Sequence, residues 1–319
     1  GEVVALINYM SQILVELVKL ANLIININKS IACGNRIQSI FEMQPSITDG
    51  SGQKVDKVQT DTADRSEEAE YAVEFSHVGL TYAGAGDESL TDIDFKVKRG
   101  ETIGIIGGTG SGKSSVVNLI PRFYDVTSGF IKVDGKDVKD YPLEELRGKI
   151  GTVLQKAVLF HGTIRENLKW GNPDATEEDL NRAITVAQAK EFVDNKEGRL
   201  DFEIEQGGKN LSGGQRQRLT IARAVVKKPE ILILDDSASA LDFATDAALR
   251  KAIREMEGET TVFIVSQRAA SIQHADRIVV LDDGKIVGLG TSEELLESCE
   301  VYQEIYNSQF KKQEGGKTA

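Results

Sequence analysis

A glycine-rich loop limits the folds open to this chain more than any other stretch, and it reads Gly107-Gly108-Thr109-Gly110-Ser111-Gly112-Lys113-Ser114. The apolar run 102–106 before it predicts a buried strand, and the stretch from Ser115 to Leu119 after it predicts a helix. Glycines let backbone N–H groups approach a phosphate closely, and a helix start adds positive potential. The loop therefore predicts a nucleotide triphosphate site, with Lys113 adding a charge and Ser114 binding Mg²⁺. A dinucleotide fingerprint is excluded because it needs a glycine where Lys113 stands.

The net charge and the cysteine content limit the classes of function that fit this chain. The 319 residues carry a formal net charge of -12, which argues against nucleic acid as the main partner. Cys33 and Cys299 are far apart and give neither a disulfide framework nor a metal-ligand spacing, as expected for a reducing cytosol. Phosphate binding is therefore expected to be local to particular loops.

The first segment, Val3 to Ile27, is rich in Val, Leu and Ile, and as a helix it would be roughly 36 Å long, enough to cross a bilayer. Polar residues recur along it at steps of three or four, which puts them on one stripe: Asn8, Gln12, Glu16, Lys19, Asn22 and Asn26. Charges at mid-depth usually face protein or a watery cavity. Periodicity alone leaves two readings open, a membrane span and an amphipathic helix on a soluble domain.

Composition changes abruptly after Pro45. Residues 46–70 are acidic and polar with almost no large apolar residues, so we expect a solvated linker. From Tyr71 the pattern becomes globular, and the continuous apolar runs 102–106, 231–234 and 261–265 predict a parallel sheet covered on both faces. Helix starts are predicted at Thr176 and, by a capping box, at Thr291.

Two further stretches carry residues that could face a metal ion or bind an anion. Asp235 follows the buried run 231–234, and an acidic group at that end of a strand can face the Mg²⁺ held by the phosphate loop. Downstream stands a serine followed by two bare glycines at the expected start of a helix, in the order Leu211, Ser212, Gly213, Gly214 and Gln215. That stretch can form a second anion site, and its plainer interpretation is an ordinary helix N-cap.

Together the phosphate loop and the stretch Leu211–Gln215 resemble the nucleotide-binding domain of ATP-binding cassette (ABC) transporters. The likeness covers about Tyr71 to Phe310. It implies an α/β fold of the P-loop NTPase (ABC ATPase) class, with a parallel-sheet core, an antiparallel β subdomain and an α-helical subdomain, preceded by a long amphipathic or transmembrane helix. It also implies ATP and Mg²⁺ as cofactors, and a signature motif, Leu211–Gln215, that contacts ATP on a partner subunit.

The resemblance assigns roles to further positions. Tyr82 falls where the family stacks a ring on adenine, and Gln155 where a glutamine touches Mg²⁺ and relays motion to the membrane part. The stretch Thr163–Leu168 matches the adjoining helical subdomain. A loop that crosses the dimer interface, here called the D-loop, matches Ser239, Ala240, Leu241 and Asp242.

The first segment is similar to the last transmembrane helix of exporter-type subunits, which leads through a cytoplasmic extension, here about Lys29 to Gln44, into the ATPase. We therefore expect four regions: helix and extension over 1–45, linker over 46–70, nucleotide-binding domain over 71–310, and flexible tail over 311–319. The chain is then expected to be the C-terminal part of a longer subunit in the cell membrane, with its ATPase domain on the cytoplasmic side. The transported substrate is not readable from the sequence.

Two positions depart from the family pattern. Next to Asp235 the family generally has a glutamate that activates water, and this chain has Asp236. The shorter side chain withdraws its carboxylate by about 1.5 Å, and a misplacement near 1 Å can lower a rate on the order of 10²-fold. Where the family has a histidine after the strand 261–265, this chain has Gln267, which cannot carry imidazole's charge or exchange its proton.

These departures predict weak or partner-dependent ATP hydrolysis. The hypothesis is a heterodimeric exporter in which this chain holds ATP at a degenerate site and lends Ser212 and Gly214 to the partner's competent site. Lys113, Asp236 and Gln267 are the candidate catalytic residues, and Ser114, Gln155 and Asp235 the candidate metal ligands. A homodimeric exporter with ordinary activity, a soluble ABC-type ATPase and a regulatory ATP sensor remain alternatives.

Overall fold

The computed structural model describes residues 1–43, 45–50, 70–237, 239–256 and 259–314. Its contacts divide the chain into two units, Gly1–Thr48 and Asp49–Ala319, each of which is described by itself. Most of the predicted linker, residues 51–69, and the last five residues of the predicted tail lie outside the described part.

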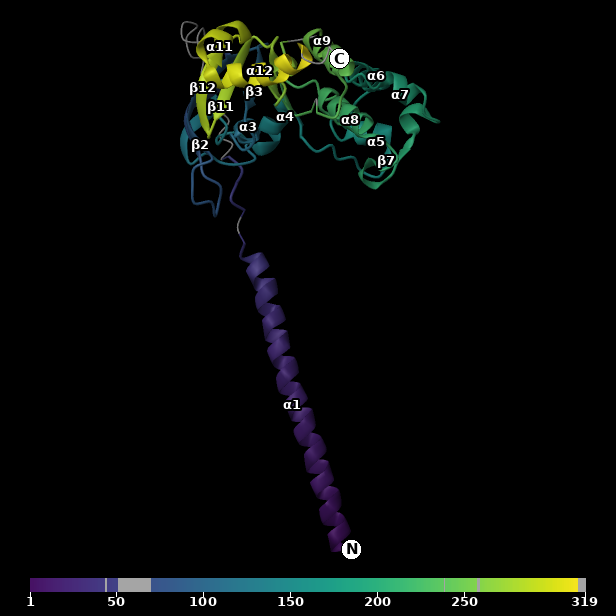
Figure 1. Cartoon of the computed structure of the whole chain (residues 1–319). Coiled ribbons are helices and arrows are strands. Elements are labelled where there is room, and N and C mark those ends of the chain that lie inside the picture. Colours follow the sequence, from purple (N-terminus) through teal and green to yellow (C-terminus); the bar gives the residue numbers. More distant parts are fainter. Residues whose placement is uncertain (44, 51–69, 238, 257–258, 315–319) are drawn as a thin grey trace, which may run out of the picture. The chain divides into compact units, whose positions relative to one another are not determined.

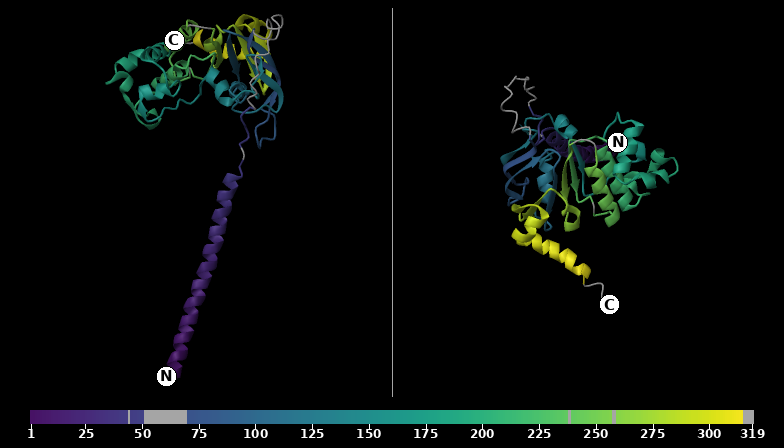
Figure 2. Two further views of the ribbon diagram at one scale, coloured as in Figure 1. Left: turned by 180° about the vertical axis from the view of Figure 1, so that it is seen from behind. Right: turned by 90° about the horizontal axis from the view of Figure 1, so that it is seen from above.

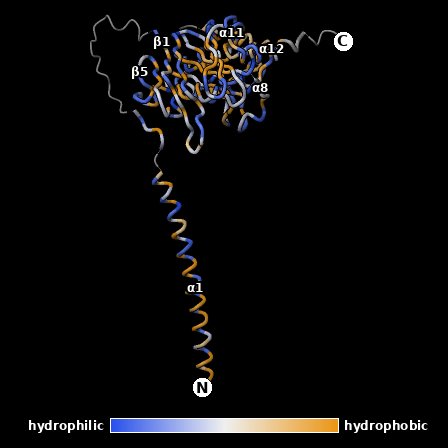
Figure 3. The backbone as a smooth tube through the Cα atoms, turned by 60° about the vertical axis from the view of Figure 1, so that its left-hand side comes forward, coloured by the Kyte–Doolittle hydropathy of each residue, from blue (hydrophilic) through white to orange (hydrophobic). Residues whose placement is uncertain are grey.

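Helix α1 spans Glu2–Phe41 with its side chains exposed (Figure 1). Within the described residues it is the one helix long and apolar enough to cross a membrane, and its N-terminal half is mostly hydrophobic (Figure 3). It continues 14 residues beyond Ile27, because no proline interrupts the chain before Pro45. Glu16 and Lys19, both on the polar stripe, form an ion pair of 2.7 Å.

A six-stranded sheet forms the centre of the second unit, in the order β12-β11-β3-β10-β9-β6. Its strands pair in parallel except for β12, which is antiparallel to β11. The strand bounds are β3 Thr102–Gly107, β6 Ile150–Val153, β9 Ile231–Asp235, β10 Thr261–Val265, β11 Arg277–Asp282 and β12 Lys285–Gly290. The parallel core predicted from the three apolar runs is confirmed.

Strand β9 explains why those runs are continuous. Its alternate residues enter different cores: Ile231 and Ile233 pack in one hydrophobic cluster, and Leu232 and Leu234 pack in the other. Successive side chains of a strand point to opposite faces, so a sheet covered on both faces needs apolar residues at every position.

The antiparallel subdomain is a four-stranded sheet in the order β2-β1-β4-β5, and it shares the first of these cores. On β2, buried and exposed residues alternate after the first two positions, as expected for a sheet with one face toward water. Its strands are β1 Tyr71–Leu80, β2 Leu90–Lys98, β4 Ser128–Val133 and β5 Lys136–Asp137.

The helical subdomain lies to one side of the sheets, at the right of Figure 1 and again beside them in both views of Figure 2. It packs through the second core, and full capping boxes begin three of its helices, at Thr163, Thr176 and Ser212. Its elements are α5 Ile164–Lys169, α6 Glu177–Val186, α7 Lys190–Asp194 and α8 Gly213–Val225, with the small ladder of β7 Gly162–Thr163 and β8 Glu203–Ile204.

The remaining helices pack around the sheet or form the C-terminal end of the described chain. They are α3 Lys113–Leu119, α4 Leu143–Lys149, α9 Phe243–Arg254, α10 Ala269–Ile272, α11 Ser292–Ser298 and α12 Glu300–Glu314. Thr291 starts α11 with the predicted capping box. Because α12 runs to Glu314, the first four residues of the predicted tail are helical.

The sheet core yields a stability prediction. Phe263 of β10 is fully buried, so Phe263→Ala should lower the free energy of unfolding by about 3–5 kcal/mol through lost burial and the cavity left behind. Denaturant unfolding in detergent measures the change. The exposed Val287 of β12 is the control, because Val287→Ala should cost less than about 1 kcal/mol. Equal losses at both positions would contradict this account of the core.

Candidate nucleotide-binding site

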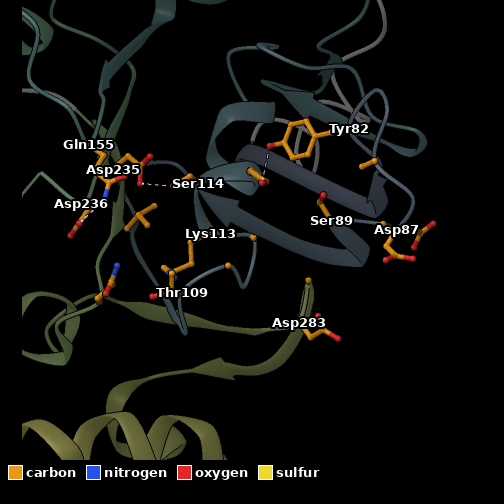
Figure 4. Close-up of a pocket in the computed structure, with 18 of the residues that line it drawn as sticks. Tyr82, Asp87, Ser89, Thr109, Lys113, Ser114, Gln155, Asp235, Asp236 and Asp283 are labelled. Carbon is orange, nitrogen blue, oxygen red and sulfur yellow. Dashed lines mark hydrogen bonds between the residues drawn. The ribbon is translucent and has the colours of Figure 1, made fainter.

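A cavity of about 590 Å³ opens where β3, β9 and β10 end (Figure 4). It brings together most of the residues predicted to bind ATP or the metal or to act in catalysis within one subunit, namely Tyr82, Thr109, Gly110, Gly112, Lys113, Ser114, Ser115, Gln155, Asp235, Asp236 and Gln267. Three other residues of the phosphate loop, Gly107, Gly108 and Ser111, do not line the cavity. The ammonium group of Lys113 contacts all three of them.

Two glycines of the loop have no room for a side chain. A Cβ on Gly107 would collide with the Leu281 carbonyl oxygen of the neighbouring strand β11. Gly112, the residue before α3, has φ 91°, and a Cβ there would lie 2.6 Å from Leu90 Cδ2. The loop therefore packs as bare backbone between β11 and β2, which leaves its N–H groups able to approach a ligand.

Lys113 lies folded back onto its own loop. Its Nζ donates hydrogen bonds to the carbonyl oxygens of Gly107 (2.9 Å) and Gly108 (2.5 Å) and lies 3.4 Å from Ser111 Oγ. Burial lowers the pKa of Lys113, and the charges of Asp235 and Asp236 oppose that shift. The ammonium is thus held at the cavity wall by neutral carbonyls, so a phosphate that approaches it meets a cation without an ionic partner in direct contact.

Ser114 and Asp235 form the predicted metal pair. The Ser114 hydroxyl donates to Asp235 Oδ1 at 3.0 Å, across 121 residues of sequence. Asp235 is almost fully buried, and burial raises its pKa, with a further rise from Asp236 and an opposing effect of the Ser114 hydrogen bond. A buried carboxylate paired only with a hydroxyl is suited to a divalent cation.

Gln155 and Asp236 form a second pair. The Gln155 Nε2 donates to Asp236 Oδ2 at 3.2 Å, so this glutamine contacts the candidate water-activating residue rather than Asp235. Asp236 has φ 45°, a left-handed conformation uncommon for a residue with a side chain, and its N–H donates to the Val265 carbonyl. The sequence did not predict either contact.

Tyr82 lies at the other end of the cavity, two residues after β1. Its hydroxyl donates to Ser115 Oγ at 2.8 Å, and its ring meets Tyr124 edge-on at 4.9 Å. Sequence reasoning missed the neighbouring wall, made by residues 85–89, Ser266, Asp283 and Gly284. The Asp283-Gly284 pair is a turn signal that could have indicated a loop there.

The lining is rich in acids, with one lysine. Asp87, Glu88 and Asp283 add to the two aspartates after β9, so an anionic nucleotide needs an accompanying cation. Mg²⁺ fits this donor set, because it prefers hard oxygen ligands and is usually held by one or two carboxylates plus substrate phosphates. Among the described residues no cluster of three or more His, Cys, Asp or Glu is placed to hold a metal ion.

The stretch Leu211–Gln215 does not line this cavity. Ser212 is the N-cap of α8: its Oγ accepts from the Gln215 N–H at 3.3 Å, and Gln215 Oε1 accepts from the Ser212 N–H. A Cβ on Gly214 would lie 3.2 Å from the Ala240 carbonyl oxygen, so the start of α8 faces the D-loop.

The D-loop is hydrogen-bonded to Asp236, which lines the cavity. Ser239 Oγ donates to the Asp236 carbonyl at 2.8 Å, and Asp242 caps α9 by accepting from the Thr245 N–H at 2.9 Å.

The sequence model of the ABC transporter family matches residues 90–239. The chain is 40% identical over 310 residues to the uncharacterized ABC transporter ATP-binding protein YfiB of Bacillus subtilis, covering 97% of this chain and 52% of YfiB. It is 37% identical to the putative multidrug export ATP-binding/permease protein YgaD of the same organism, covering 97% of this chain and 52% of YgaD. The chain thus spans about half the length of the curated relatives it matches.

The fold of this chain is also similar to that of a solved ABC exporter. A bacterial Atm1-family ABC exporter with ATP bound matches with a TM-score of 0.72 and 33% identity, over 76% of this chain and 42% of that chain.

The burial of Asp235 yields a pH prediction. The folded state holds the Asp235 proton more tightly than the unfolded chain, so this group's contribution to stability falls as pH rises from the ordinary aspartate pKa through the raised value. Asp235→Asn should therefore stabilise the nucleotide-free protein at neutral pH, and the gain should vanish in acid. It should also abolish stabilisation by Mg²⁺ with ATP.

Unfolding curves at neutral and acid pH measure both effects. Asp179→Asn is the control of opposite sign, because the hydrogen bond from Lys228 lowers the Asp179 pKa and that variant should lose stability at neutral pH. An Asp235→Asn protein less stable than the parent at neutral pH would refute the burial argument.

Proposed function

Because this chain belongs to the ABC transporter family and carries its ATP-hydrolysing domain, we propose that it is the ATP-binding part of an exporter subunit. ATP with Mg²⁺ binds in the cavity and joins two subunits, and the motion that follows drives export. Support for the exporter class comes from the fusion of α1 to the domain and from relatives whose names include an export protein and an Atm1-family exporter.

One observation carries the proposal: Lys113, Ser114 and Asp235 converge on one cavity, while the capped start of α8 lies outside it. A site of this kind is complete only when a second subunit brings its own serine-glycine helix start to the nucleotide. Ser212 and Gly214 serve the partner's site in the same way.

The cavity of this chain is proposed to be a weak hydrolytic site. Asp236 is shorter than the usual glutamate, is held in a left-handed backbone conformation, and already accepts a hydrogen bond from Gln155. Gln267 supplies an uncharged amide at the cavity wall where the family has a histidine. The chain therefore holds ATP more than it turns it over, and a partner subunit of a heterodimer supplies the fast site.

In the membrane we propose that α1 is the last span of the subunit and that the nucleotide-binding domain faces the cytoplasm. Exposed apolar residues near Gln155 in the sequence support contact with a membrane-spanning region. They are Leu154, Val158 and Phe160, which are 50%, 44% and 45% exposed, and Phe160 contacts Trp170, which is 69% exposed. Phe160 and Trp170 pack together at 5.0 Å between ring centroids.

The weak-site proposal is tested by restoring the family residues. The double variant Asp236→Glu, Gln267→His should raise the steady-state ATPase rate of this chain by up to about 10²-fold, because the carboxylate regains its reach and the imidazole its proton. The intact Ser212 stretch lets two copies of the variant complete each other's sites. Phosphate release in detergent or liposomes measures the rate.

The variant Asp236→Asn, Gln267→His is the matched control, since it restores the imidazole without a carboxylate and should stay slow. A parent chain that is already fast alone, and loses that activity with Asp236→Asn, would instead support the homodimer with ordinary activity.

The contact in trans is tested by Ser212→Asp. Aspartate caps a helix about as well as serine, so the thermal stability of the chain should change by less than about 1 kcal/mol equivalent, while a negative charge now faces the γ-phosphate of the partner's ATP. Turnover of the assembled pair should fall by at least about tenfold, as expected for an unfavourable charge worth more than 1.4 kcal/mol. Full turnover by the Ser212→Asp pair would rule out the contact.

A further inference from the structure

The segment that follows β10 connects the cavity to the C-terminal helix. Gln267 lines the cavity and is solvent-exposed. On its N-terminal side, the Ser266 N–H donates to the Ile105 carbonyl at 3.1 Å, and Ser266 Oγ accepts from the Arg268 N–H at 2.9 Å. The segment thus leaves the sheet as a tight turn before the one-turn helix α10.

A single side chain from α12 holds this turn on its other side. Gln309 Nε2 donates to the Gln267 carbonyl at 2.8 Å, and Gln309 Oε1 accepts from the Ala269 N–H at 2.9 Å. Both partners are backbone groups, on either side of Arg268. The amide of glutamine combines a donor and an acceptor in one plane, so the side chain matches this pair of groups in a way that a hydrocarbon or a carboxylate cannot.

The helix that carries Gln309 is itself anchored. Tyr302 of α12 is fully buried and its hydroxyl lies 2.8 Å from Ser292 Oγ. Ile305, Tyr306 and Phe310 pack against the second core, and the rings of Tyr306 and Phe310 stack at 4.3 Å. The amide of Gln309 therefore reaches the turn from a fixed support, 42 residues away in sequence from the group it holds.

From this geometry we propose that Gln309 is a positioning residue for ATP recognition. It fixes the backbone from which Gln267 enters the cavity, and so sets the ability of the Gln267 amide to hydrogen bond the γ-phosphate. The inference rests on the proposed function, in which this cavity binds ATP with its γ-phosphate toward Gln267. Affinity for ATP then depends on α12, whereas affinity for ADP, which lacks that phosphate, does not.

The experiment measures equilibrium dissociation constants of the full chain in detergent for ATP and for ADP, each with Mg²⁺. Gln309→Met removes both hydrogen bonds at nearly the same side-chain size, and should weaken ATP binding about three- to tenfold, the effect of one lost hydrogen bond. ADP binding should change less than about twofold. Gln309→Glu is a second variant, which keeps the bond to Ala269 but turns a carboxylate toward the Gln267 carbonyl, and it should show the same selective loss.

Four further measurements separate positioning from general damage. Gln303→Met, on the same helix, removes a hydrogen bond to the Leu296 carbonyl away from the cavity and should leave both affinities unchanged. Gln267→Ala should show the ATP-selective loss, and adding Gln309→Met to it should weaken ATP binding no further, because the two residues act as one unit. Hydrogen exchange at the Ala269 amide should quicken in Gln309→Met.

The outcomes distinguish a failure of the proposed function from a failure of the proposal for Gln309. If Gln267→Ala leaves ATP affinity unchanged, the proposed placement of the γ-phosphate is wrong. If Gln267→Ala weakens ATP binding and neither Gln309 variant does, the positioning role of Gln309 is wrong and the proposed function stands. Equal losses of ATP and ADP affinity in both Gln309 variants would reduce Gln309 to a structural residue.

Discussion

The pairing of β10 between β3 and β9 is the constraint on which the site depends. The three strands run in parallel and in register, with Val265 opposite both Ile105 and Asp235. Parallel strands bring their carboxyl ends to one edge of the sheet, so the phosphate loop after β3, the two aspartates after β9 and the turn after β10 meet there. This end of the cavity is thus a consequence of strand register, and the phosphate loop, the two aspartates and Gln267 occupy positions that the central sheet assigns to them, whereas Tyr82 and residues 85–89 come from the antiparallel subdomain.

Burial gives this meeting point its electrostatic character. The pKa of Lys113 is lowered and that of Asp235 is raised, in both cases chiefly by burial, so each group is pushed toward its neutral form. Their direct partners are carbonyl oxygens for the lysine and a hydroxyl for the aspartate. Lys113 and Asp235 are therefore two desolvated ionisable groups whose direct hydrogen-bond partners, among the described residues, are uncharged. A triphosphate with a divalent cation would compensate both at once, which supports the proposed ligand.

Local patterns were predictable from the sequence where one interaction decides the structure. The apolar runs of β3, β9 and β10 could be recognised because strands buried on both faces leave no alternation. The helix starts at Thr176 and Thr291 could be recognised because a cap is a contact over three residues. The end of α1 was less predictable, since Gly34 weakens a helix without stopping it, and Lys29 and Arg36 end the apolar run but favour helix.

Contacts across long sequence separations were out of reach. Gln155 with Asp236 and Gln309 with Gln267 join residues 81 and 42 positions apart, and no periodicity encodes such a pair. The site assignments made from the family resemblance remain predictions until the variants are measured.

The two interpretations of Ser212, as a helix N-cap and as part of a second anion site, are compatible with each other. As the N-cap of α8 its hydroxyl accepts a hydrogen bond from Gln215, which orients the helix start whether or not a nucleotide is near. The residues that would hold this chain's own ATP stand at the edge of the central sheet, whereas Ser212 starts α8 of the helical subdomain, which packs against that sheet through a shared hydrophobic core. Position 236 meets the D-loop, which borders the start of α8, through its backbone carbonyl, and a side-chain substitution retains that group. Side-chain changes at positions 236 and 267 therefore leave the described contacts at the start of α8 in place, as the proposed lending of this surface to a partner requires.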